Sequence, residues 1–133
     1  EMISDFTVDN LNYSLNLAKT RYSNFLDVED FIDIKNRILL LINNEKFASL
    51  IKDSEFITEQ SLVYKEEIKI IDLLLFKENN YYIIDYKTTK EKSAEHTVQV
   101  AHYKKAIKDI FKTQNVFSYL IYLHPTEVFI SEV

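Results

Sequence analysis

Two charged residues stand one position apart at the end of an apolar stretch, in the segment "YYIIDYKTTK". Side chains alternate between the two faces of a strand, so Asp85 and Lys87 are predicted to share one face. The preceding apolar segment, "IKIIDLLLFK", carries an isolated acid of its own, Asp72. A hairpin of the two segments would bring the three charges together, with opposed Cβ atoms about 5 Å apart.

The loop between the two segments decides whether Asp72 meets the other two charges. A two-residue loop at 78–79 sets Asp72 opposite Asp85, whereas a loop at 79–80 sets it opposite Lys87. A three-residue loop without a bulge would turn Asp72 to the other face. Asparagine suits the positive φ that two-residue turns require, and the segment contains two adjacent asparagines. Both two-residue registers predict a cluster.

Two carboxylates this close repel, and one keeps its proton unless a cation neutralises the pair. Lys87 supplies one positive charge, and oxygen ligands on a rigid sheet suit Mg²⁺ or Mn²⁺. A lysine beside such a metal can orient or deprotonate a water, or stabilise charge developing on a phosphate. The set therefore suits phosphodiester hydrolysis. The same spacing also fits a structural Asp–Lys ion pair at a strand end, and the pattern alone leaves that alternative open.

The surrounding periodicity predicts a single mixed α/β domain over residues 1–133, with helices in 8–52 and a sheet core in 55–133. On the long helix at 95–112, the residues Val98, Ala101, Ile107 and Phe111 are predicted to form the buried face. The expected helices cover 8–20, 29–42, 45–52 and 95–112, and the expected strands cover 56–65, 68–77, 81–87, 116–123 and 127–133.

Composition excludes several classes of protein. The chain has no cysteine, which excludes disulfides, zinc–thiolate sites and an iron–sulfur cluster held by thiolates. It has no glycine, which excludes a P-loop and a glycine-rich dinucleotide motif, so any ATP-driven motor must lie elsewhere. No apolar run reaches the length of a membrane helix, and no signal peptide is evident. We expect a cytoplasmic protein without a membrane partner.

Lysines are concentrated in one part of an otherwise acidic chain. The net charge is −5, yet residues 87–112 contain seven lysines and only three acidic residues. One hypothesis is that these lysines contact DNA phosphates, which would make binding depend on salt. The alternative is a solvated helix face. The lysines expected to bind DNA are Lys90, Lys92, Lys104, Lys105 and Lys108.

A longer pattern joins these pieces. Asp72 is followed thirteen residues later by "DYK" at 85–87, and then by a helix with Gln99 and Tyr103 four positions apart, on one helix face. Over roughly residues 57–108 the chain resembles the PD-(D/E)XK nuclease superfamily. More narrowly, it resembles the RecB-type nuclease domain at the C-terminal end of RecB and AddA helicase–nuclease subunits.

The resemblance implies a restriction-endonuclease-like core, a mixed central sheet of about five strands flanked by helices. It implies an Mg²⁺- or Mn²⁺-dependent deoxyribonuclease that hydrolyses DNA ends, single- or double-stranded, in double-strand-break repair. A helicase motor in the same chain or complex, and a second AddB-like subunit, are the implied partners, and the chain is expected to be a C-terminal fragment. The implied site residues are Asp72 and Asp85 as metal ligands and catalytic residues, Lys87 as the catalytic lysine, and Glu59, Gln99 and Tyr103 in support.

The chain departs from the family pattern in its first helix. There the family commonly has a metal-binding histidine, and the corresponding phrase here, "LNYSLN", has Asn12 instead. An amide oxygen can reach a hard metal but carries no charge, so Asn12 is expected at most to assist as a ligand. This departure favours a second hypothesis, a degenerate nuclease fold that only binds DNA or a partner subunit. A third is a stand-alone endonuclease of restriction or phage type.

Overall fold

The computed structural model describes residues 28–87 and 93–133. Within them the protein is a mixed α/β fold with one five-stranded sheet and three flanking helices. This confirms the predicted fold class, and each predicted strand lies within two residues of its observed position. The elements are α2 (Val28–Ile42), α3 (Glu45–Ile51), β1 (Glu55–Tyr64), β2 (Glu67–Lys77), β3 (Asn80–Lys87), α4 (Ala94–Phe111), β4 (Val116–Leu123) and β5 (Val128–Glu132).

The turn between β2 and β3 has the first of the two predicted registers. Lys77 pairs with Asn80 and Leu73 pairs with Ile84, which leaves a two-residue loop. Both loop residues, Glu78 and Asn79, have left-handed backbone, with φ of 52° and 64°. This is the conformation that a tight hairpin with the right-handed strand twist requires. The register places Asp72 level with Asp85.

Helix α4 connects the two parallel strands in the centre of the sheet. The strand order is β1-β2-β3-β4-β5, antiparallel except for the β3–β4 pair. A parallel pair needs a crossover connection, which α4 provides. The helix begins where the Ser93 side chain accepts a hydrogen bond from the Glu95 N–H, and it ends at Lys112 in left-handed conformation. The first turns of α4 therefore lie near the end of β3 that carries Asp85 and Lys87.

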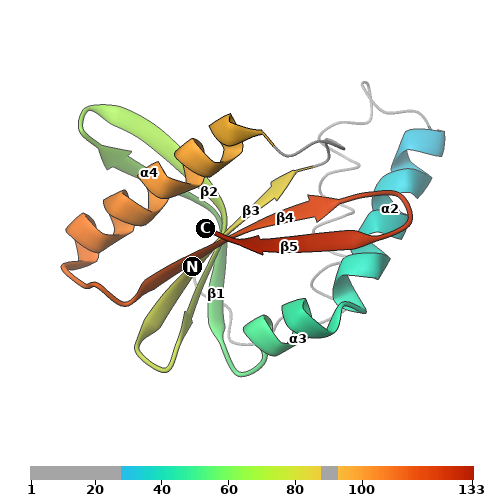
Figure 1. The fold of residues 1–133 in the computed structure, drawn as a ribbon, viewed down its shortest axis with the longest axis horizontal. Helices are drawn as coiled ribbons and strands as arrows, with labels where there is room; N and C mark the ends of the chain where they lie inside the picture. Colours follow the sequence, from blue (N-terminus) through green and yellow to red (C-terminus); the bar gives the residue numbers. More distant parts are fainter. Residues whose placement is uncertain (1–27, 88–92) are drawn as a thin grey trace.

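Helices cover both faces of the sheet, which gives three layers (Figure 1). Leu41 of α2 and Phe47 of α3 pack with Leu73 and Ile84 on one face. Tyr103 and Ile107 of α4 pack with Ile83 and Leu74 on the other. Burial of this apolar surface from water is the main force that holds the layers together.

Next to Asp72, the side chains of β2 stop alternating regularly between the two faces of the sheet, and we call this the face inversion. Leu73 packs on the α2–α3 side, but Ile71 and Leu74 both pack on the α4 side, although strict alternation would separate them. The register of paired residues skips Glu59 and Asp72 while it continues on both sides of them. Glu59 has a φ of 50°, and such a left-handed residue within a strand twists and interrupts the ladder locally.

The predicted buried face of α4 is largely wrong. Ile107 is buried, but Ala101 is exposed, and Val98 and Phe111 are 55% and 47% exposed. The helix instead packs on the sheet through Val100, Tyr103, Ala106 and Ile107. Its position over β3 and β4 selects a face that overlaps the predicted one only at Ile107. None of the helices in the described ranges is both long and apolar enough to cross a bilayer.

Candidate active site

Asp72 lies at the point where β2 inverts its faces, and it is half-buried. Its carboxylate accepts a hydrogen bond of 2.9 Å from the backbone N–H of Tyr86. Burial raises the pKa of Asp72 to about 6, and the Asp85 carboxylate beside it contributes to this rise. The Tyr86 N–H and the Lys87 ammonium act in the opposite direction. Desolvation therefore outweighs the stabilising contacts, and Asp72 is poised to accept a cation.

Asp85 is the most deeply buried carboxylate of the site, with 4% exposure. The Lys87 amine stands 3.0 Å from its Oδ2 atom, which makes an ion pair across one strand period. Oδ2 nevertheless lacks a partner in hydrogen-bonding geometry in the described part of the protein. The charge of Lys87 therefore offsets part of the cost of burying this carboxylate, while a hydrogen-bond donor for Oδ2 is missing among the described residues.

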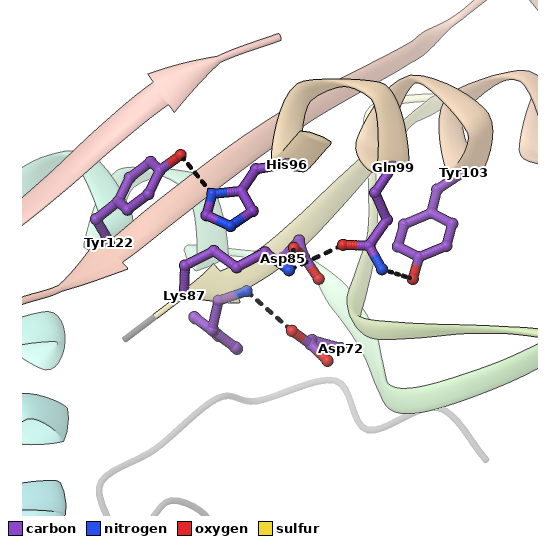
Figure 2. A network of polar contacts seen from close by, with 8 residues as sticks. Asp72, Asp85, Lys87, His96, Gln99, Tyr103 and Tyr122 are labelled. Atoms are coloured by element: carbon purple, nitrogen blue, oxygen red, sulfur yellow. Dashed lines mark hydrogen bonds and ion pairs between the residues drawn. The ribbon is translucent and has the colours of Figure 1, made fainter. Parts of the chain in front are cut away.

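A chain of hydrogen bonds runs from Lys87 to α4 (Figure 2). The Lys87 amine donates to Oε1 of Gln99 at 2.8 Å, and the Gln99 amide donates to the hydroxyl of Tyr103 at 3.0 Å. Tyr103 is 6% exposed and packs in the α4-side core, so it anchors the chain. Its pKa is raised by burial and by the negative charges of Asp85 and Asp72. The structure therefore brings together Asp72, Asp85, Lys87, Gln99 and Tyr103.

A second contact between α4 and the sheet was not predicted from the sequence. Nδ1 of His96, in the first turn of α4, lies 3.1 Å from the hydroxyl of Tyr122 (Figure 2). Tyr122 is the β4 residue that pairs with Lys87 of β3, so this contact holds the start of α4 beside the site. The sequence does not predict this contact, because the parallel register that aligns Tyr122 with Lys87 depends on how the whole β3–α4–β4 segment folds.

The two carboxylates of the site supply part of the ligand set that a hard divalent cation needs. Magnesium in proteins is commonly held by one or two carboxylates, with waters and substrate phosphates completing its six ligands. Asp72 and Asp85 supply such a pair, with the charge of Asp85 acting on Asp72 and Lys87 beside Oδ2 of Asp85. Among the described residues, no group of three or more acidic, histidine or cysteine side chains gathers at one point.

The other predicted site residues lie elsewhere or outside the described ranges. Glu59 is exposed on β1, level with Asp72, but it does not join the two aspartates in a three-ligand group. The Lys104 amine donates to the backbone oxygen of Val133, beside β4 and β5. Lys105 is exposed, and Lys108 is half-buried in the last turn of α4. Asn12, Lys90 and Lys92 fall outside the described residues.

Comparison with known proteins gives a weak structural likeness. No family model matches the chain, and no curated protein matches it. Among solved structures, the fold is similar to the crystal structure of SSO0001, with 16% sequence identity and a TM-score of 0.44. The similarity covers 94% of this chain and 61% of the other one, so this chain spans less than two thirds of that protein's length.

Proposed function

We propose that this protein is a metal-dependent deoxyribonuclease domain that hydrolyses phosphodiester bonds at DNA ends. One observation carries the proposal, which is that Asp72, Asp85 and Lys87 meet at the end of β3, with the lysine amine held by Gln99. A structural ion pair between Asp85 and Lys87 alone would not account for the second carboxylate, Asp72, whose pKa the charge of Asp85 raises. The sequence resemblance to RecB-type nuclease domains supports the same reading, as part of a helicase–nuclease that processes double-strand breaks.

The residues of the site have distinct roles in the proposed reaction. Asp72 and Asp85 would hold Mg²⁺ or Mn²⁺, which when bound lowers the pKa of a water and neutralises charge on the phosphate. The Lys87 ammonium has three N–H donors; it donates one to the carbonyl of Gln99, and it forms an ion pair with Asp85 that lacks hydrogen-bonding geometry. Its other N–H groups are left to orient the attacking water or to stabilise a phosphate oxygen.

Gln99 and Tyr103 act as positioning residues for Lys87. A lysine side chain has many rotamers, and fixing one of them removes an entropic cost from the reaction. The hydrogen bonds from Lys87 to Gln99 and from Gln99 to Tyr103 achieve this from a buried anchor.

The test is cleavage of linear single- and double-stranded DNA in Mg²⁺ and in Mn²⁺. The wild-type protein is expected to degrade DNA, and Asp85→Ala and Lys87→Ala are expected to lose that activity. Lys52→Ala is the matched control, because Lys52 is an exposed residue at the end of α3 and does not belong to the site or to the lysines expected to bind DNA. If wild type and all three variants degrade DNA equally, the assigned site is wrong. Circular DNA as a further substrate separates a stand-alone endonuclease from an enzyme that needs ends.

The second candidate is a degenerate nuclease fold that binds DNA or a partner subunit without cleaving. The two-carboxylate site, without a third acidic or histidine ligand among the described residues, favours it. Wild-type protein that binds DNA in a gel-shift assay, but cleaves in neither metal even with its motor present, would establish this candidate.

A further inference from the structure

His96 lies beside Lys87, although the two residues come from different elements. Nδ1 of His96 is 3.1 Å from the hydroxyl of Tyr122, and the His96 ring is half-buried. Tyr122 is paired with Lys87 in the parallel β3–β4 ladder, so the two side chains are on the same side of the sheet. Neighbouring strands are about 4.8 Å apart, which makes Tyr122 and Lys87 direct neighbours there.

His96 and Gln99 project from the same face of α4. They are three positions apart in the helix, a spacing that puts two side chains next to each other. Gln99 accepts the hydrogen bond of 2.8 Å from the Lys87 amine. Figure 2 shows the side chains of His96 and Gln99 extending from the helix toward Lys87. The site therefore includes a histidine, the side chain that most often transfers protons near neutral pH.

The groups of the site follow one another in order across the sheet. Asp72 is on β2, Asp85 and Lys87 are on β3, and His96 is tied to β4 by its contact with Tyr122. The two carboxylates would hold their cation on the β2 side of Lys87, whereas His96 lies on the β4 side. In displacement at phosphorus, the attacking and leaving oxygens are roughly in line, on opposite sides of the phosphorus atom. A phosphate over the Lys87 amine that is attacked from the cation side has its leaving oxygen on the His96 side.

We propose that His96 is the general acid of the reaction and gives the proton on its Nε2 atom to the oxygen that leaves phosphorus. The proposal rests on the proposed nuclease function, and it assigns the leaving-group side of the same site. Water attacks phosphorus and loses one proton to solvent, while the bond from phosphorus to the bridging sugar oxygen breaks. That oxygen takes the Nε2 proton of the protonated His96 ring, which becomes neutral and regains a proton from solvent.

Tyr122 is the positioning residue for His96. In the protonated ring both nitrogens carry hydrogen, so Nδ1–H donates to the Tyr122 hydroxyl and the Nε2 proton is the one that is transferred. Tyr122 is 2% exposed and packs with Val100 and Leu120. Its hydroxyl is therefore a fixed acceptor that holds the His96 ring in one orientation.

Two substrates that differ in their leaving group test the proposal in Mg²⁺. An oligothymidylate releases a sugar alkoxide, which needs a proton, whereas thymidine 5′-(p-nitrophenyl phosphate) releases p-nitrophenolate, which does not. We expect His96→Ala to lower the single-turnover rate on the oligothymidylate about 100-fold or more, because general acid catalysis has this size. The rate on the nitrophenyl ester should stay within about twofold of wild type, since its leaving group needs no general acid.

Further variants make the test specific to proton transfer. His96→Gln can keep a hydrogen bond to Tyr122 but cannot act as an acid, so it should lose the same rate as His96→Ala. Tyr122→Phe should give a smaller loss, again on the oligothymidylate alone. Thr97→Ala is the matched control, because Thr97 is the exposed neighbour of His96 on α4, and it should change neither rate. Asp85→Ala should lose both rates, since the cation serves either substrate.

Two results would overturn the proposal while wild type is active. An equal fall of both rates in His96→Ala and His96→Gln would give His96 a structural or positioning role. An unchanged rate on the oligothymidylate in both variants would give it no role in the reaction. Activity that requires Asp85 but not His96 would keep the proposed function and refute this inference alone. Wild-type protein that hydrolyses neither substrate, even with its motor present, would refute both.

Discussion

The carboxylate of Asp72 accepts a hydrogen bond of 2.9 Å from the backbone N–H of Tyr86. Tyr86 stands between Asp85 and Lys87 in the sequence, and its side chain packs on the opposite side of the sheet. The contact therefore ties β2 to the middle of the "DYK" segment through the backbone. A substitution at position 86 would change the core but would leave this donor in place.

The raised pKa of Asp72 makes stability depend on pH in the absence of divalent metal. With its folded pKa at about 6 and its ordinary value at 3.8, the folded state binds more protons between these values. The free energy of unfolding therefore falls as pH rises across that interval. Asp72→Asn keeps an acceptor for the Tyr86 N–H and removes this dependence. We expect the melting temperature of Asp72→Asn minus that of wild type to become more positive as the pH rises from about 4 to 6.

Thermal denaturation in EDTA over this pH range measures the effect. Glu132→Asn is the control, because Glu132 is an exposed acid on an edge strand. A difference in melting temperature between Asp72→Asn and wild type that stays constant with pH would contradict the assignment of the titration to Asp72.

Added Mg²⁺ or Mn²⁺ is expected to stabilise the folded protein above pH 6. At a free metal concentration ten times the dissociation constant, the gain is about 1.4 kcal/mol. The gain should shrink below pH 6, because a proton on Asp72 competes with the metal. Differential scanning calorimetry measures it, with Asp85→Asn expected to abolish the gain. Equal stabilisation of wild type and Asp85→Asn would show that the metal binds elsewhere.

The hydrogen bond between Gln99 and Lys87 is expected to affect turnover more than stability. Gln99→Ala leaves the Lys87 amine without its acceptor on α4, and we expect kcat to fall at least about tenfold with little change in KM. Gln99 is exposed, so its replacement should shift the melting temperature little. Steady-state kinetics together with thermal denaturation separate the two effects. Gln114→Ala, at an exposed position in the α4–β4 loop, is the control.

A loss of stability in Gln99→Ala without a loss of kcat would assign Gln99 a structural role only. Tyr103→Phe provides a second check, because it removes the hydroxyl that Gln99 contacts but keeps the buried ring. A smaller fall in kcat than that of Gln99→Ala is expected.

Glycine at the left-handed turn positions is expected to stabilise the protein. Glu66 and Glu78 have φ of 64° and 52°, a conformation that costs a residue with a Cβ about 1 kcal/mol or more. Glu66→Gly and Glu78→Gly should each raise the free energy of unfolding by about 0.5–1 kcal/mol, since glycine adopts this conformation without strain. Urea denaturation measures the gain. Glu29→Gly in α2 is the control, with an expected loss of about 1 kcal/mol.

The sequence predicted the strands well because their apolar residues and turns are local signals. Asp72, Asp85 and Lys87 could be placed together, since only the length of one loop had to be decided. The exposed position of Val98 and the face inversion at Asp72 could not be predicted. Both depend on how α4 and the hairpin lie on the sheet, and several apolar faces of α4 would have satisfied its sequence.

Two kinds of contact could not be predicted from the sequence: those made by backbone groups, and those between side chains far apart in the chain. The Tyr86 N–H is a donor that every non-proline residue has, so its use by Asp72 has no sequence signature. The contact between His96 and Tyr122 joins residues 26 positions apart, and it depends on the parallel register of β3 and β4.

The two-residue turn between β2 and β3 has a consequence for how this chain can vary. Any residues that tolerate the left-handed backbone can occupy positions 78 and 79, but one inserted residue would turn Asp72 away from Asp85 unless a bulge absorbed it. The turn at Lys65 and Glu66 lies at the far end of the β1–β2 hairpin, beyond the face inversion, and can lengthen without moving the carboxylates. Insertions should therefore be found at the turn of Lys65 and Glu66 and excluded from the turn at positions 78 and 79, while substitutions are tolerated in both.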